Sequence, residues 1–211
     1  MHIPDGFLDT KTWVALSAVS AGFVALSIAR ANRKLGEKHV PLMGVMSAFI
    51  FAAQMLNFPV AGGTSGHFMG AVLAAVLLGP FAGTLIMTIV LTVQCLMFAD
   101  GGITALGANI FNMGIVGSLS GYLIYLLFST IIKGKIGKLT GAFIAGWASI
   151  VLAASACAVE LAVSGTIALN VALPAMAGVH MIIGIGEALI TTMVLTLILT
   201  VRPDLVELPK I

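Results

Sequence analysis

Long apolar runs constrain the fold of this chain more than any other feature of its sequence. Stretches of about 20 residues with almost no charge recur along its length. Only 9% of the residues are charged, against about 25% in soluble domains. A membrane accepts such runs as helices, because a helix satisfies its backbone polar groups internally. The sequence therefore predicts an all-α integral membrane protein.

Seven transmembrane helices are predicted from these runs. The expected spans cover about residues 12–31, 40–60, 67–78, 80–99, 109–130, 139–163 and 174–201, and the third is unusually short. Nine of the ten Lys and Arg residues fall on one side of this arrangement, with only Lys11 on the other. The positive-inside rule then places the N-terminus outside and the C-terminus in the cytoplasm.

The N-terminus itself is a candidate metal chelate. The chain begins Met1-His2-Ile3-Pro4-Asp5-Gly6, so the amine, the His2 backbone nitrogen and the His2 imidazole Nδ1 could bind one ion in a plane. Nickel(II) and copper(II) favour tetragonal nitrogen sites of this kind. The first span does not resemble a cleaved signal, because acidic residues precede it and its basic cluster follows it. We therefore expect Met1 and His2 to remain in the protein.

A second imidazole is expected on the same face as His2. The predicted topology places the segment 61–67, Ala-Gly-Gly-Thr-Ser-Gly-His, outside. Its glycines permit a tight turn back toward the membrane, although such a segment can equally be an ordinary turn. His67 could then supply a fourth nitrogen to an ion held by Met1 and His2.

Several polar residues in or beside the spans could orient these imidazoles. Ligating histidines usually donate their second N–H to an acceptor, although Asn and Gln in membranes often only hydrogen bond between helices. His180, Glu160 and Glu187 are ionisable residues within apolar spans and are functional candidates for that reason. The candidates for supporting the metal ligands are Gln54, Asn57, Ser65, Asp100, Asn109, Asn112 and His180.

The combined motifs resemble the CbiM/NikM family, the substrate-binding (S) components of energy-coupling-factor (ECF) transporters for cobalt and nickel. The resemblance rests on residues 1–6, Gly-Thr-Ser-Gly-His at 63–67, residues 100–109 and Gly-Val-His at 178–180. It implies one transmembrane domain over 1–211, in which 39–211 form a six-helix core and 1–38 form an additional N-terminal segment and helix. It also implies metal ligation by Met1, His2 and His67.

The resemblance also implies partners and a cellular location. The partners are a transmembrane coupling (T) subunit, cytoplasmic ABC ATPase subunits and, in some systems, a small accessory membrane subunit. The expected location is the inner membrane of a prokaryotic cell, and the expected pathways are nickel uptake and cobalamin biosynthesis. Ni²⁺ or Co²⁺ is then the transported substrate, and no catalytic cofactor is expected.

Other functions are less consistent with the sequence. The chain lacks a Walker A pattern and a His-Glu-x-x-His motif, so we expect no enzyme, and ATP hydrolysis would come from partner subunits. Its net charge of +2 is too small to indicate a nucleic-acid partner. The alternative is a stand-alone secondary metal transporter or channel, in which Glu160, His180 and Glu187 relay protons or pass ions.

Overall fold

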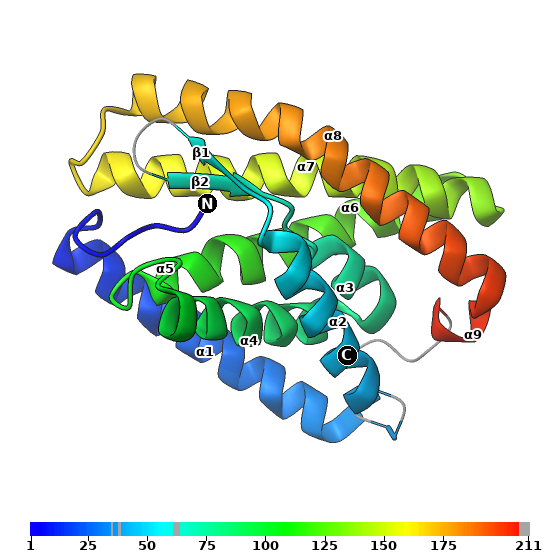
Figure 1. The fold of residues 1–211 in the computed structure, drawn as a ribbon. Helices are drawn as coiled ribbons and strands as arrows, with labels where there is room; N and C mark the ends of the chain where they lie inside the picture. The colour runs from blue at the N-terminus through cyan, green and yellow to red at the C-terminus, as the bar shows by residue number, and fades with distance from the viewer. Residues whose placement is uncertain (35, 38, 61–63, 207–211) are drawn as a thin grey trace.

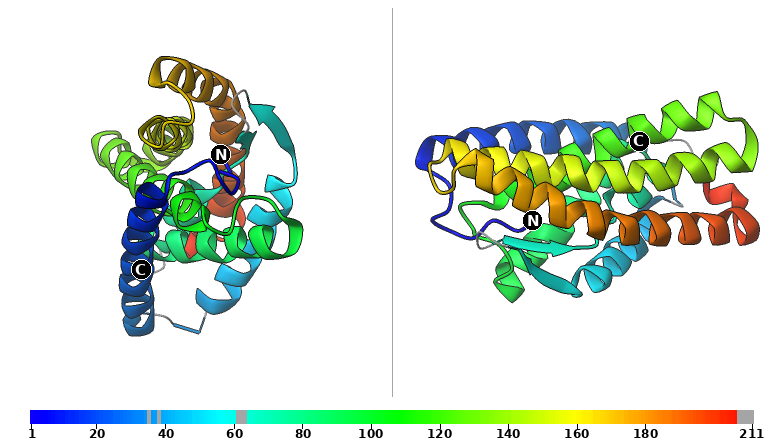
Figure 2. Two further views of the ribbon diagram at one scale, coloured as in Figure 1. Left: turned by 90° about the vertical axis from the view of Figure 1, so that its left-hand side faces the viewer. Right: turned by 90° about the horizontal axis from the view of Figure 1, so that it is seen from above.

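An elongated bundle of helices forms the molecule (Figures 1 and 2). The computed structural model describes residues 1–34, 36–37, 39–60 and 64–206. Within these ranges, five helical segments are long and apolar enough to cross a membrane. Their outward faces carry exposed side chains such as Leu26, Leu123 and Ile182, as lipid contact requires. The five are α1 (Thr10–Lys34), α4 (Pro80–Phe98), Leu106–Ile131, α7 (Gly134–Val163) and α8 (Leu169–Val201).

The second predicted span is interrupted by a β-hairpin. Helix α2 (His39–Gln54) has 16 residues, and β1 (Asn57–Val60) then pairs antiparallel with β2 (Thr64–His67), with Asn57 opposite His67. Pro59 explains the helix ending early, because proline has no N–H for a helix and favours extended backbone in the residue before it. The all-α prediction is therefore wrong at this hairpin. The predicted turn at Gly62 and Gly63 lies outside the described residues.

The short third helix is the centre of the bundle. All eight residues of α3 (Ala71–Leu78) are buried, and α3 packs against α4, α6 and α7. Gly79, with φ of 98°, and Pro80 separate α3 from α4. Glu187 of α8 accepts hydrogen bonds from the backbone N–H groups of Met69 and Gly70, just before α3 begins. This buried carboxylate therefore satisfies backbone donors where the broken helix starts.

The fifth predicted span contains a stretch of π-helix. It consists of α5 (Leu106–Asn109), the π-helix η1 (Ile110–Val116) and α6 (Gly117–Ile131). The wider π turn separates residues that an α-helix would align. Asn109 and Asn112 are three residues apart and would share one face of an α-helix. In the structure they bond different partners, Ile3 and Glu160.

The remaining helices differ from the predictions mainly at their ends. Helix α7 begins five residues before the predicted boundary at 139, and α8 begins at Leu169, so Pro174 lies inside it. Asp9 precedes α1, and its carboxylate accepts a hydrogen bond from the Thr12 N–H at 3.0 Å. A short α9 (Pro203–Val206) ends the described chain. The seven-span count and the orientation of the termini stay predictions.

Candidate metal site

The N-terminal segment turns back from the start of α1 into the bundle and ends beside β2 (Figure 1). Met1 and Ile3 are fully buried and His2 is 3% exposed, which is unusual for the end of a chain. Asn109 holds Ile3 from both sides, because it accepts a hydrogen bond from Ile3 N–H at 2.8 Å and donates one to Ile3 O at 3.2 Å. Gly102 N–H also donates to Ile3 O at 2.9 Å. The first three residues therefore occupy a defined position.

A second anchor joins Asp5 to the loop between α4 and α5. The Asp5 carboxylate accepts hydrogen bonds from the backbone N–H groups of Ile103 and Thr104 and from the Thr104 hydroxyl. These three donors lower the pKa of Asp5, the Thr104 hydroxyl foremost. The loop approaches closely, since a Cβ at Gly102 would collide with the Asp5 backbone. Residues 1–5 and the loop therefore form one packed unit.

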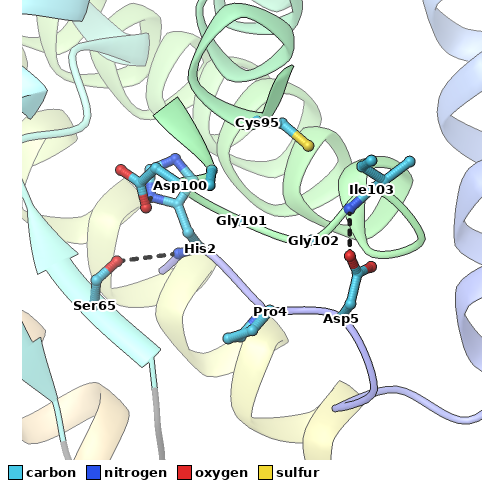
Figure 3. Close-up of a pocket in the computed structure, with 10 residues that line it drawn as sticks. His2, Pro4, Asp5, Ser65, Cys95, Asp100, Gly101, Gly102 and Ile103 are labelled. Carbon is cyan, nitrogen blue, oxygen red and sulfur yellow. Dashed lines mark hydrogen bonds and ion pairs between the residues drawn. The ribbon is translucent and has the colours of Figure 1, made fainter. Parts of the chain in front are cut away.

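The terminal amine and the His2 backbone nitrogen face the same serine. The Met1 amine donates hydrogen bonds to Ser65 O and to Ser65 Oγ, the latter at 3.1 Å. His2 N–H points at Ser65 Oγ at 3.3 Å (Figure 3). Ser65 belongs to β2, so the hairpin that interrupts the second predicted span places it here. The N–H groups of two of the three proposed N-terminal ligand atoms are therefore directed toward Ser65.

The two imidazoles meet directly. His67 Nε2 lies 3.1 Å from His2 Nδ1, and the ring centroids are 4.7 Å apart. His67 is fully buried at the end of β2. The predicted proximity of His2 and His67 is therefore present in the structure.

A chain of hydrogen bonds determines the tautomer of His2. Gln54 donates to Met69 O at 2.7 Å, which leaves its oxygen to accept from Gln94 at 2.9 Å. The Gln94 oxygen then faces His2 Nε2 at 3.0 Å. Met69 O can only accept, so it fixes the orientation of the Gln54 amide and, through it, that of the Gln94 amide. The Gln94 oxygen must then accept from His2, and His2 Nε2 carries the proton. His2 Nδ1 is therefore unprotonated and carries a lone pair.

His67 has the opposite tautomer for the same kind of reason. Its Nδ1 lies 2.7 Å from the carbonyl oxygen of Phe68, so Nδ1 carries the proton and Nε2 carries a lone pair. Asp100 Oδ1 is a third acceptor, 3.4 Å from His2 Nδ1. His2 Nδ1 thus faces two other acceptors, His67 Nε2 and Asp100 Oδ1, with no hydrogen between it and either of them.

Burial keeps the Met1 amine and the His2 imidazole in their neutral forms. It lowers the pKa of the Met1 amine from 8.0 to about 5. Burial, followed by the nearby terminal ammonium, lowers the pKa of His2 to about 3. Both groups are therefore neutral near pH 7, and an incoming metal ion meets little proton competition there.

The other predicted supporting residues lie in different places. Asn57 is exposed on β1, and Asn112 donates to Glu160 Oε2 at 2.7 Å. His180 Nδ1 bonds Met176 O at 2.7 Å, and its Nε2 has no hydrogen-bond partner among the described residues. Within the described residues, the side chains of Asn57, Asn112 and His180 make no hydrogen bond to the imidazole of His2 or His67, whereas Ser65 lies at the His2 backbone nitrogen and Asp100 at His2 Nδ1.

Gln94 was not predicted from the sequence to lie at this site. It is 1% exposed in α4 and connects His2 to Gln54. The available signal was the same as for Gln54, an amide inside an apolar run. Within the described ranges, no three His, Cys, Asp or Glu side chains form a group that could hold a metal. A site here depends on the backbone nitrogen and the amine as well as the imidazoles.

Comparisons with known proteins identify relatives of this chain. Residues 2–205 match the family model CbiM, described as the cobalt uptake substrate-specific transmembrane region. The chain is 46% identical over 209 residues to an Archaeoglobus fulgidus protein named as a candidate fused nickel transport protein NikMN, covering 98% of this chain and 68% of that protein. It is 35% identical over 220 residues to the fused nickel transport protein NikMN of Rhodobacter capsulatus, covering 97% of this chain but only 63% of that protein.

A solved structure has the same fold. The fold superposes with a TM-score of 0.89 on a crystal structure described as a transition metal transporter, with 38% sequence identity, covering 95% of this chain and 93% of the other. Together with the apolar helices, these matches indicate a multi-pass membrane protein of prokaryotes. The chain belongs to the CbiM family of nickel and cobalt transport proteins.

Proposed function

We propose that this chain captures Ni²⁺ or Co²⁺ on the external face of the membrane as the substrate-binding component of an ECF-type transporter. The ligands are the Met1 amine, the His2 backbone nitrogen and Nδ1, and His67 Nε2. The observation that carries the proposal is the pair of lone pairs on His2 Nδ1 and His67 Nε2, 3.1 Å apart. Two nitrogens bonded at right angles to a metal at about 2.0–2.1 Å would be about 2.9 Å apart. The observed separation is close to that value.

Ni²⁺ is the favoured substrate under this proposal. A planar set of four nitrogens that includes a deprotonated backbone nitrogen suits a d⁸ ion, whereas Co²⁺ gains less from that geometry. Cu²⁺ would bind still more tightly by the general order of divalent metals, so its exclusion depends on availability. The bound nickel is expected to be low-spin and diamagnetic.

Release to the cytoplasm is assigned to partner subunits. A transmembrane coupling subunit and ABC ATPases would supply the energy, in some systems with a small accessory membrane subunit. In this arrangement residues 1–38 hold the N-terminus at the site and residues 39–211 form the core. The alternative, a stand-alone transporter, predicts nickel uptake into energised vesicles that contain this chain alone. Uptake that appears only with the partner subunits would exclude it.

The decisive experiment adds one residue before Met1. Two full-length proteins are prepared from cleavable fusions, one beginning at Met1 and one beginning Gly-Met1, and mass spectrometry verifies both ends. The added glycine converts the amine into an amide and moves the new amine out of the five-membered chelate ring. We expect tight, diamagnetic nickel binding only in the protein that begins at Met1.

A matched control separates chemistry from packing. The same glycine added after Ile211 changes the length equally and leaves the proposed ligands alone, so this protein is expected to bind nickel normally. The apo thermal unfolding midpoint of each protein reports whether the N-terminal extension disturbs the fold. Unchanged nickel affinity and magnetism in the Gly-Met1 protein would refute the proposed ligand set.

A further inference from the structure

A pocket of about 400 Å³ reaches His2 from the end of the bundle that carries the N-terminus (Figure 3). Its lining includes His2, Ser65 and two carboxylates, Asp5 and Asp100. Met1 and His67, by contrast, are fully buried. A cation approaching the proposed nitrogen ligands through this pocket therefore reaches His2 Nδ1 beside a carboxylate.

The two carboxylates of the pocket differ in their hydrogen bonding. Asp5 accepts three hydrogen bonds from Ile103 and Thr104 and is committed to holding the loop. Asp100 accepts no hydrogen bond from the residues that the structure describes, and its side chain is 31% exposed. The close polar contact that its side chain makes among these residues is with His2 Nδ1 at 3.4 Å, which is itself an acceptor. Asp100 is thus a carboxylate free to meet a cation.

Asp100 does not complete a side-chain site with both imidazoles. It lies near His2 Nδ1, yet no group of three His, Cys, Asp or Glu side chains suited to a metal occurs in the described ranges. Its position therefore suits an early contact better than permanent ligation. The negative charge of Asp100 attracts a hydrated divalent cation, and its oxygens can accept hydrogen bonds from the water ligands of that cation. Both interactions can form before the cation exchanges water for nitrogen ligands.

We propose that Asp100 is a positioning residue that draws the hydrated Ni²⁺ or Co²⁺ ion into the pocket and presents it to His2 Nδ1. This inference rests on the proposed N-terminal chelate and adds the first step of capture to it. A charge acting on the approach accelerates association and is weakened by salt, because mobile ions screen exposed charges over about 10 Å at 0.1 M. Dissociation from the finished chelate does not involve it.

The test measures the association and dissociation rates of nickel chloride with the purified full-length protein in an uncharged detergent. Asp100→Asn keeps the shape and removes the charge, whereas Asp100→Glu keeps the charge. We expect Asp100→Asn to slow association about tenfold at low salt and to weaken its salt dependence. The dissociation rate and the absorption spectrum of the bound nickel should not change. Asp100→Glu should restore most of the association rate.

A charge-matched control is Glu37→Gln. Glu37 is an exposed carboxylate beyond the far end of α1, so its loss should leave both rates unchanged. An unchanged association rate in Asp100→Asn would overturn the proposal. So would a faster dissociation or an altered spectrum, because either would make Asp100 a ligand of the bound ion. The Gly-Met1 protein is measured in parallel: nickel binding that survives there refutes the chelate itself, whatever Asp100 does.

Discussion

The Nδ1 atom of His2 and the Nε2 atom of His67 lie 3.1 Å apart, and each nitrogen turns an unprotonated lone pair toward the other. Two acceptors at this distance repel, and the burial of both rings weakens the screening of that repulsion. The Phe68 carbonyl and the Gln94–Gln54 chain prevent either ring from changing its tautomer without losing a hydrogen bond. The proposed site is therefore preorganised for a cation.

Nickel should stabilise the protein through His67 and not through His180. At a free concentration about 100-fold above the dissociation constant, binding to the native state contributes about 2.7 kcal/mol. We expect the resulting rise in thermal midpoint to disappear in His67→Gln. His180→Gln should keep it, because His180 bonds Met176 O and lies outside the proposed ligand set. Loss of the nickel shift in His180→Gln alone would make His180 the ligand instead.

Gln94 should affect nickel affinity without touching nickel. Gln94→Met keeps the approximate shape but removes the acceptor for His2 Nε2–H, so the ring loses its fixed tautomer. Groups that orient metal ligands are typically worth 10–100-fold in affinity, and we expect a loss of about that size by isothermal titration. Gln94→Glu retains an acceptor for His2 Nε2–H and should therefore lose less nickel affinity than Gln94→Met. Thr88→Val is the control on the same helix, because the Thr88 hydroxyl bonds Thr84 O alone among the described residues. An equal loss there would indicate general damage to α4.

Gly101 should be essential for the fit of the loop against His2. Its φ is +94°, and a Cβ would lie 2.9 Å from Asn109 Nδ2 and 3.4 Å from His2 Cδ2. Gly101→Ala therefore adds a clash to a backbone strain of about 1–3 kcal/mol. Gly6→Ala is a matched control, because Gly6 also has positive φ but no atom within 4 Å of the added Cβ. We expect thermal unfolding to show a larger loss in Gly101→Ala, and nickel affinity to fall only there.

The parts of the fold that depend on local hydropathy could be predicted from the sequence. The helices α1, α4, α7 and α8 follow from apolar runs, and their ends shift by a few residues because capping decides them. The β1–β2 hairpin was missed because its ladder depends on pairing between segments that are both apolar or small. The nearness of Ser65 and His67 to His2 could nevertheless be predicted, since the motif that contains them is compact.

The tautomers could not be predicted, and Gln94 shows why. Gln94 and Gln54 are 40 positions apart in the sequence, and their contact depends on the rotation of α4 relative to α2. Hydropathy places both amides inside the membrane but does not determine which way they face. Asn112 illustrates the converse, since the π-helical stretch turns it toward Glu160. A helical wheel drawn from the sequence assumes an α-helix and cannot detect this rotation.

The depressed pKa values set the number of protons that nickel must displace. With a pKa of about 5 for the Met1 amine and about 3 for His2, both are already deprotonated between pH 6 and 8. The His2 backbone N–H is then the one proton that the N-terminal chelate releases in this range. In an unfolded peptide the amine has a pKa near 8 and the imidazole near 6.5, so both add protons to be displaced.

Nickel affinity should therefore rise with pH more gently in the protein than in a peptide of residues 1–6. We expect the logarithm of the association constant to increase by about one per pH unit between pH 6 and 8 in the protein, and by about two or more in the peptide. Below pH 5 the protein slope should steepen, because the Met1 amine then binds a proton in the metal-free state. Competition titrations with a calibrated chelator measure both slopes. A protein slope as steep as that of the peptide would mean that the amine is not buried as a neutral base, and a slope of zero would exclude the backbone nitrogen as a ligand.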